Sequence, residues 1–360
     1  MTSEVSAAGV DYPVVIAPNL LAELPRRFAA RYPGSHVVVL TDNRVWDLYG
    51  EALVRGLAEQ GIEADDIVVP EGETSKSLDV FSGIIEELHH HRFDQESILI
   101  NLGGGMITDL GGFVAASYRK GVRAIHVPTT LFAQQEAAFS TRAGINTNWS
   151  KNFISSAASP DGVYCDTSSL KTLSRRDLTS GLAATLKIAI AYDNELFTML
   201  ERGAKTLLDG AAPQNIDGIV LRACQTRLVT SNHKGRELAV PFAHALEAGC
   251  RYGGVLHGEA IGWGLAIATL VAERRRLLDE YSAHRILRLL TMCELPPEVP
   301  RRVLTNAIDR MDLGESGEMI LPTHIGGVTT ARPSVADLHE ALRSLRQQSI
   351  SIDRDQQDAA

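Results

Sequence analysis

Short runs of Val, Ile and Leu alternate with amphipathic segments over the first 155 residues, and this alternation constrains the fold more than any other feature of the chain. The apolar runs lie at residues 13–17, 36–41, 65–70, 97–105 and 123–130. Between them, apolar residues recur every three or four positions, which is the helical period. Strands that alternate with helices in this way favour a parallel sheet covered on both faces. We therefore predict an α/β, doubly wound, Rossmann-like sheet.

The pattern changes beyond about residue 175, where helical spacing dominates and strand signals are few. Pro and Gly interrupt the chain at "AASPDGVYCD", residues 157–166, and we place the domain boundary there. The prediction is an α/β domain over residues 1–158, an all-α domain over residues 159–346 and a disordered polar tail over residues 347–360. A small hairpin is expected within "MILPTHIGGVTT".

Composition narrows the class of protein. With 44% hydrophobic and 22% charged residues, the 360-residue chain is typical of a soluble globular protein. The net charge of −9, without basic clusters, argues against nucleic acid as a partner. The apolar runs are too short for a membrane span, and "MTSEVSAAGVDYP" lacks a secretion signal. Four scattered cysteines without a CxxC pair favour the cytoplasm over a disulfide framework.

A run of three glycines follows one predicted strand and opens a helix in "INLGGGMITDLGG". Glycines let a ligand approach the backbone, and a helix N-terminus attracts a pyrophosphate. The motif is not GxGxxG, so a tight turn that needs small residues is the alternative interpretation. Two more loops follow strands: one carries Asp42, and the other carries Glu73 and Lys76. Parallel sheets bind ligands at the carboxyl ends of their strands, so the three loops together predict a dinucleotide site.

The segment "FAHALEAGCRYGGVLHGEA" combines two histidines with two glutamates. His244 and Glu247 stand three residues apart, so on a helix they share a face. His257 and Glu259 follow a Gly-Gly pair that allows the chain to fold back. Zinc needs three or four converging ligands, and spacing alone does not decide which of these side chains converge.

Six segments of the chain resemble, in order, the 3-dehydroquinate synthase family, the sugar phosphate cyclases. They are "PEGETSKSL", "GGGMITDLGGFVAASY", "VPTTLFAQ", "KNFISSAASP", "SGLAATLK" and "HALEA…HGEAIGWG". The GGG…D motif is shared with iron-dependent alcohol dehydrogenases, whereas the VPTT and KN segments favour the cyclases. The resemblance implies a dehydroquinate synthase-like fold, with an NAD-binding domain, a helical metal-binding domain and an active site in the cleft between them. Such enzymes oxidise a hydroxyl with tightly held NAD, eliminate phosphate, return the hydride and close a carbocycle.

The positions that match the family's NAD contacts are nearly all retained, so the resemblance implies NAD as cofactor. Several of them lie in the loops that the strand pattern already places at the carboxyl edge of the sheet. The matching positions are Asp42, Asn43, Glu73, Lys76, Gly104, Gly105, Asp109, Thr129, Thr130, Lys151, Thr172 and Asp177.

The family's zinc ligands, by contrast, are mostly lost. The family takes zinc from a glutamate in "SGLAE" and from two histidines, one in "GHxxGH" and one in "HGEA". Here Ala184 and Val240 occupy the first two positions, and only His257 remains. Losing a group that merely orients a ligand weakens metal binding about 10- to 100-fold, and losing two ligands costs more. We therefore expect no zinc. The alternative is a rebuilt site drawn from His257, His244, Glu247 or His233.

The segments that handle phosphate in the family are altered as well. Arg142 stands where the family has the lysine of "GGKTG", Glu136 replaces the preceding aspartate, and Arg227 replaces another lysine. An arginine presents a planar fork where a lysine presents a point charge. The family's "DKK" becomes "MDLGE" at residues 311–315, which removes a lysine. We therefore expect a small polyol, cyclitol or sugar-derived substrate in place of a phosphorylated heptulosonate.

The resemblance and the charges nominate six catalytic candidates. An imidazole is suited to proton transfer near neutral pH, although His244 is also explained as a helix residue that only hydrogen-bonds a neighbour. His257 contacts substrate or is retained by packing. Lys187 lies about one helical turn beyond Ala184, on the same side, and Arg142 is suited to binding an anion in bidentate fashion. The six candidates are Lys187, His244, Arg142, His257, Lys120 and Asn152.

Three functions are compatible with these residues. The first is an NAD-dependent, zinc-free relative of the cyclases in bacterial specialised metabolism, a carbon–oxygen lyase that oxidises an alcohol transiently before an elimination. The second is a net NAD(H)-dependent polyol or cyclitol dehydrogenase. The third is a catalytically degenerate subunit that binds NAD and partners an active cyclase. The first, as a cytoplasmic homodimer, is the working hypothesis.

Overall fold

The chain divides into two compact units. A computed structural model describes residues 3–5, 11–147, 151–209, 213–230, 233–250, 254–296, 298–311 and 317–345. Unit 1 comprises Met1–Leu178 with Pro213–Val229, and unit 2 comprises Thr179–Ala212 with Thr230–Ala360. This division differs from the boundary expected near residue 158, because the chain adds a further strand to unit 1 after that point and later returns to it with one helix. The expected tail, 347–360, and residues 312–316 of the altered "MDLGE" segment lie outside the described residues.

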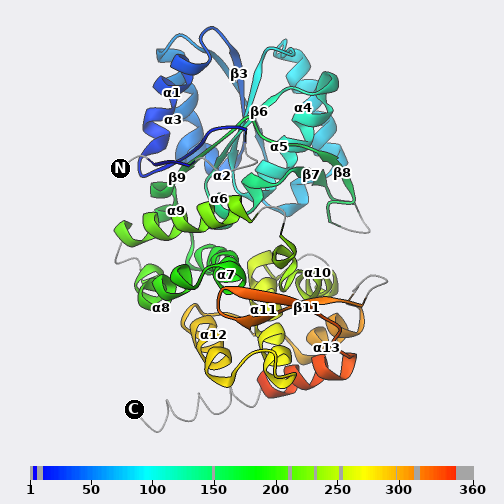
Figure 1. Ribbon diagram of the computed structural model, residues 1–360. Coiled ribbons are helices and arrows are strands. Elements are labelled where there is room, and N and C mark those ends of the chain that lie inside the picture. The colour runs from blue at the N-terminus through cyan, green and yellow to red at the C-terminus, as the bar shows by residue number, and fades with distance from the viewer. Residues whose placement is uncertain are drawn as a thin grey trace. The chain divides into compact units, whose positions relative to one another are not determined.

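Unit 1 is built on a seven-stranded sheet with the order β1-β2-β9-β6-β5-β3-β4 (Figure 1). The strands are β1 (Ser3–Val5), β2 (Val14–Ala17), β3 (His36–Asp42), β4 (Glu63–Val69), β5 (Ile98–Gly103), β6 (Arg123–Pro128) and β9 (Gly162–Asp166). All neighbouring pairs from β2 to β4 are parallel, and only β1 runs antiparallel. The predicted parallel sheet is therefore confirmed, and the carboxyl ends of six strands share one edge.

Helices cover both faces of this sheet. They are α1 (Leu20–Arg31), α3 (Glu51–Glu59), α4 (Leu78–His90) and α5 (Gly105–Ser117). Unit 1 also contains α2 (Asn43–Val45), α6 (Leu131–Gln135) and α9 (Pro213–Val229). Along β3, Val37 and Val39 face the core formed with α1 and α3, whereas Val38 and Leu40 face the core formed with α4 and α5. Helices α1 and α3 lie on one side of the sheet and α4 and α5 on the other (Figure 1). Side chains alternate between the two faces of a strand, so a strand that is apolar at every position is buried on both sides.

A two-stranded hairpin that the apolar pattern does not predict lies between β6 and β9 in the sequence. Strands β7 (Arg142–Ile145) and β8 (Ile154–Ala157) pair in antiparallel register, and β7 packs against α5. The hairpin escaped the sequence pattern because β8 is largely exposed and lacks an alternation of apolar residues.

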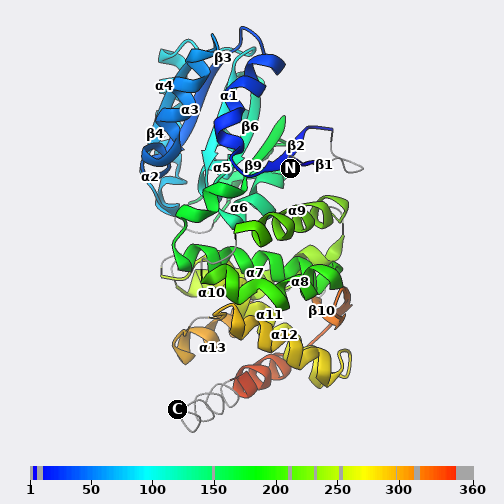
Figure 2. The ribbon, with the colours of Figure 1, turned by 90° about the vertical axis from the view of Figure 1, so that its left-hand side faces the viewer.

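Unit 2 is mainly helical, as predicted. Its helices are α7 (Arg175–Tyr192), most of which belongs to this unit, α8 (Asn194–Leu208), α10 (Val240–Gly249), α11 (His257–Arg274), α12 (Glu280–Met292), α13 (Arg301–Asp309) and a last helix over residues 335–345. Helix α11 is buried along most of its length and packs against α10 and α12 (Figure 2). The expected hairpin is present as β10 (Met319–His324) and β11 (Gly327–Ala331). None of the described helices is both long and apolar enough to cross a membrane.

Candidate functional site

The loops after β3 and β4 are tied together at the carboxyl edge of the sheet. Asp42 ends β3, and its carboxylate accepts a hydrogen bond of 2.9 Å from the Val45 amide, which caps α2. Burial raises the pKa of Asp42. The side-chain oxygen of Asn43 accepts a 2.7 Å hydrogen bond from the Glu71 amide, in the loop after β4. Both of these sequence-predicted residues therefore lie at the expected edge. One side-chain oxygen of each accepts a hydrogen bond from a backbone N–H and so holds the loops in place.

The glycine turn after β5 lies against the loop after β6. The Thr129 amide donates to the carbonyl of Gly103 at 2.9 Å, which holds the two turns side by side. A Cβ on Gly104 would lie 3.1 Å from the Thr130 side chain, so a larger residue would crowd this approach. Helix α5 begins at Gly105 without a side-chain cap. Its first amide groups and its dipole therefore remain suited to an anion.

A compact group of four charged side chains lies beside this turn. Lys76 is only 3% exposed, and its ammonium contacts the carboxylate of Asp109, which projects from α5. The same ammonium lies 3.9 Å from Glu73, and the ammonium of Lys151 lies 3.8 Å from the same Glu73 oxygen. We call these four residues the edge cluster. It joins the loop after β4, helix α5 and the loop between β7 and β8.

Asn146, which no sequence pattern indicates, links the members of this cluster. Its amide nitrogen donates to the Glu73 carboxylate at 2.8 Å, and its backbone N–H donates to the Lys76 carbonyl at 2.8 Å. Its side-chain oxygen accepts from the backbone of Asn152 at 2.9 Å. An asparagine that follows a short strand is an ordinary turn residue, so the sequence held no signal for this role.

Two of the expected NAD contacts have local partners. The Thr172 hydroxyl donates to the Ser169 carbonyl at 2.9 Å and lies 2.8 Å from the Tyr49 hydroxyl. The Asp177 carboxylate accepts a 2.6 Å hydrogen bond from Ser174, whose oxygen in turn accepts from the Asp177 amide. The second of these bonds is the usual cap of a helix N-terminus, here that of α7.

Three catalytic candidates of unit 1 are not brought together. Asn152 is exposed, in the loop after β7. Arg142 is also exposed and donates to the Ser155 hydroxyl at 2.8 Å, across the hairpin. Lys120 is exposed and precedes β6, so it lies at the amino end of a parallel strand, opposite the edge that carries Asp42.

A buried ion pair joins Arg227 of α9 to Glu136, which follows α6. The two side chains meet at 3.2 Å, and Arg227 is only 2% exposed. One terminal nitrogen of this guanidinium is buried without a hydrogen-bond partner among the residues that the structure describes. The resemblance marks both positions as departures from the family, but it does not predict their pairing, because 91 residues separate them.

In unit 2, three of the four residues named for a rebuilt metal site converge. The possible ligand atoms of His244, Glu247 and His257 all lie within 4.8 Å of one another. Glu247 is 1% exposed and meets a ring nitrogen of His257 at 2.9 Å, and the two imidazole rings are 5.8 Å apart. We call these three residues the His-Glu-His cluster. The fourth residue, His233, instead contacts the ring of Tyr192.

Lys187, the remaining catalytic candidate, lies on α7 in the same unit. Its side chain is buried, as is the methyl group of Ala184 one turn earlier. The start of α11 packs directly on this helix, because a Cβ on Gly258 would lie 1.9 Å from the carbonyl oxygen of Ser180. This close approach brings His257, the first residue of α11, to the helix that carries Ala184.

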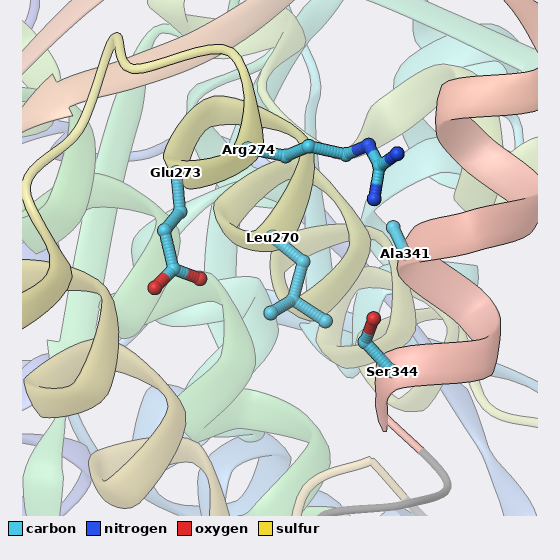
Figure 3. Close-up of a pocket in the computed structure, with 5 residues that line it drawn as sticks. All are labelled: Leu270, Glu273, Arg274, Ala341 and Ser344. Atoms are coloured by element: carbon cyan, nitrogen blue, oxygen red, sulfur yellow. The ribbon is translucent and has the colours of Figure 1, made fainter.

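A cavity of about 320 Å³ elsewhere in unit 2 is separate from these residues (Figure 3). It lies between the end of α11, which contributes Leu270, Glu273 and Arg274, and the last helix, which contributes Ala341 and Ser344. His257 stands at the opposite end of α11, about 20 Å away at 1.5 Å per residue. The cavity is therefore no part of the His-Glu-His cluster.

Comparison with known proteins identifies the family. Residues 66–180 match the 3-dehydroquinate synthase N-terminal family, and residues 181–313 match the 3-dehydroquinate synthase C-terminal family. Together these matches cover more than half of the chain. The chain belongs to the 3-dehydroquinate synthase family. The resemblance on which the sequence-based prediction rested is confirmed, and so is the fold.

Solved structures share the fold of this chain. The 2-epi-5-epi-valiolone synthase of Streptomyces hygroscopicus subsp. jinggangensis 5008, with NAD⁺ and Zn²⁺ bound, is 26% identical, with a TM-score of 0.83 over 96% of this chain and 99% of that one. A 2-deoxy-scyllo-inosose synthase complexed with carbaglucose-6-phosphate, NAD⁺ and Co²⁺ is 19% identical, with a TM-score of 0.80 over 94% and 98%. The glycerol dehydrogenase of Schizosaccharomyces pombe shares the fold at 16% identity, with a TM-score of 0.68 over 93% and 89%.

The zinc site that the 3-dehydroquinate synthase resemblance implies does not fit this chain. Ala184 offers a buried methyl group and Val240 an apolar side chain at the start of α10, and neither has an atom that binds a cation. Only His257 remains of the three implied ligands. A single imidazole does not make a structural or catalytic zinc site, each of which needs at least three protein ligands.

Proposed function

We propose that this member of the 3-dehydroquinate synthase family is an NAD-dependent enzyme that oxidises an alcohol transiently, eliminates a leaving group and then returns the hydride, without the family's zinc. The edge cluster beside the glycine turn is the observation that carries the proposal. We further propose that the enzyme is a cytoplasmic homodimer of bacterial specialised metabolism and acts on a small polyol, cyclitol or sugar-derived substrate.

The features of unit 1 support NAD as the cofactor. The uncapped start of α5 suits a pyrophosphate, and Asp42 stands where doubly wound sheets place the acidic residue that accepts from a ribose. Lys76 and Lys151 provide donors and positive charge, while Glu73 and Asp109 hold both ammonium groups in place. When bound, NAD supplies a hydride acceptor.

Unit 2 supplies the charges that the chemistry needs on the substrate. Oxidation of an alcohol requires a group that takes the hydroxyl proton and a positive charge near the developing alkoxide. We assign the proton to the exposed imidazole of His244 and the positive charge to Lys187. His257, held by the buried carboxylate of Glu247, binds a substrate hydroxyl. These assignments replace the Lewis acid of the family with fixed organic charges.

The test is a stopped-flow record of nicotinamide absorbance with chelator-treated protein and a panel of polyols, cyclitols and sugar phosphates that includes carbaglucose-6-phosphate. We expect NADH to form and disappear within one turnover, with a product that has lost its leaving group and no net change in NAD. Absorbance that stays flat with every compound would overturn the proposal.

Two other functions predict different records. A net dehydrogenase, favoured by the fold shared with the glycerol dehydrogenase, would accumulate one NADH for each substrate oxidised. A degenerate subunit, favoured by Ala184 and Val240 at the zinc positions, would bind NAD without turnover. It would also co-purify with a relative that retains all three zinc ligands. In that case Lys187→Met and His244→Ala would not change the activity of the relative with which the subunit associates.

A further inference from the structure

We infer that the His-Glu-His cluster of unit 2 is a binding site for a divalent transition-metal ion of the zinc type. This ligand set shares only His257 with the set that the family resemblance implies, and it recruits His244 and Glu247 in place of the missing ligands. The inference goes beyond the proposed function, which assigns no metal to the chain.

The donor set matches the chemistry of such an ion. Two imidazole nitrogens and one carboxylate form one of the ligand sets by which proteins hold catalytic zinc with a fourth position left open. Borderline ions such as Zn²⁺ and Co²⁺ accept imidazole, whereas Mg²⁺ and Ca²⁺ prefer oxygen donors alone. The cluster therefore selects for the first class of ion.

The helices place the three side chains in a way that suits coordination. His244 and Glu247 stand three residues apart on α10, so they project from one face. His257 begins α11, whose start is fixed against α7 by the contact between Gly258 and Ser180. The ligand atoms lie within 4.8 Å of one another, and tetrahedral coordination at about 2.1 Å needs them about 3.4 Å apart. Binding of an ion therefore requires the three side chains to draw about 1 Å closer together.

Charge also favours a cation at this point. Glu247 is almost completely buried, and its carboxylate meets a ring nitrogen of His257 at 2.9 Å. A buried carboxylate is costly unless it is paired, and a divalent cation offers two positive charges where an imidazolium offers one. The charge of Glu247 also affects a neighbouring group. Burial is the larger cause that raises the pKa of the Cys250 thiol, and the negative charge of Glu247 is the second.

Binding of an ion and proton transfer by His244 exclude each other, because a ring nitrogen that holds a metal has no lone pair for a proton. With the proposed function in place, the ion therefore inhibits the reaction. This part of the inference rests on the proposed function, whereas the binding of the ion does not.

The experiment measures binding directly, in protein that carries Cys250→Ser so that this thiol does not contribute. Co²⁺ is titrated into metal-free protein and followed by its visible absorption, and Zn²⁺ is then added to displace it. We expect one ion per chain, and affinity at least tenfold weaker in each of three variants: His244→Ala, Glu247→Gln and His257→Ala. His233→Ala, which removes a histidine of the same unit outside the cluster, is the matched control and should bind as the parent does.

Circular dichroism and the denaturation midpoint of each metal-free variant report whether unit 2, which carries the substitutions, is folded. The metal site would be overturned if the parent protein does not bind Co²⁺. It would also be overturned if His257→Ala and Glu247→Gln bind Co²⁺ as tightly as the parent does. Activity is recorded separately with added Zn²⁺. Inhibition agrees with both proposals, whereas activation would leave the metal site standing and overturn the zinc-free reaction.

Discussion

At the scale of single residues, His126 shows how strongly the interior of unit 1 controls charge. Its ring lies in β6 with one nitrogen 3.2 Å from the amide nitrogen of Asn101, and that nitrogen accepts the hydrogen bond when the ring is neutral. Burial lowers the pKa of His126 to about 4. Between about pH 4 and pH 6.5 the imidazole is therefore neutral in the folded chain and protonated in the unfolded chain, in which the histidine pKa is near 6.5.

We predict that this histidine makes unit 1 less stable in mild acid. The stabilisation is fully present above pH 6.5 and falls as the pH drops towards 4, because only the unfolded state takes up the proton. Between pH 7 and pH 5 the loss is about 2 kcal/mol for the pKa values cited. Denaturant titrations at several pH values should show a shallower dependence for His126→Gln, while His89→Gln, at an exposed position, keeps the parental slope. Identical slopes for His126→Gln and the parent would contradict this.

At the scale of elements, close helix contacts in unit 2 depend on residues without side chains. Gly258 of α11 lies against the Ser180 carbonyl, and Gly264 of the same helix lies against the backbone of Ala239. These two contacts let α11 run buried through the unit, with His257 at its start. A pattern of apolar residues predicts that such a helix is buried, but not which glycine meets which carbonyl.

Gly258→Ala should therefore destabilise unit 2. The new methyl group would lie 1.9 Å from the Ser180 oxygen, and such overpacking costs about 3 kcal/mol. Gly249→Ala, at the end of α10, is the matched control because its methyl group would meet only Val303, at an ordinary 3.8 Å. We expect that control to stay within about 0.5 kcal/mol of the parent in denaturant titrations. A Gly258→Ala protein as stable as the control would show that the α7–α11 contact is looser than described.

At the scale of the whole molecule, the chain divides its chemistry between two compact units. Unit 1 carries the glycine turn and the edge cluster, and unit 2 carries Lys187 and the His-Glu-His cluster. A ligand that binds one unit stabilises that unit by mass action, whatever happens in the other. NAD should therefore raise the unfolding temperature of unit 1, and divalent ions that of unit 2.

We predict that NAD stabilises unit 1 and that Lys76→Met removes much of this effect. At a concentration 100 times the dissociation constant, NAD contributes about 2.7 kcal/mol. Removing a hydrogen bond from a charged group should weaken NAD binding about tenfold or more and so lower that contribution by about 1.4 kcal/mol. Lys171→Met, an exposed change in the same unit, should leave it unchanged. Calorimetry of all three proteins with and without NAD checks this, and equal affinities would remove the edge cluster from the cofactor site.

The sequence by itself determined the class of fold, the edge of the sheet and the family. Short, uniformly apolar runs that alternate with helical segments favour strands buried on both faces of a parallel sheet. Turn residues such as Asp42 and Gly104 then lie at one end of the strands. The resemblance also predicts the loss of two zinc ligands, at Ala184 and Val240, and this loss stays a prediction. Such features depend on local composition and order, which a linear pattern records.

Only the tertiary structure decided which side chains meet. Asn146 contacts Glu73, Arg227 contacts Glu136, and the chain returns to unit 1 with α9, although these segments lie far apart in the sequence. The tertiary structure also decided that His244 and Glu247 converge with His257. It likewise placed Lys120 away from the edge of the sheet that carries Asp42. These distances depend on how helices pack and on which strand ends they cover, and spacing along the chain does not encode either one.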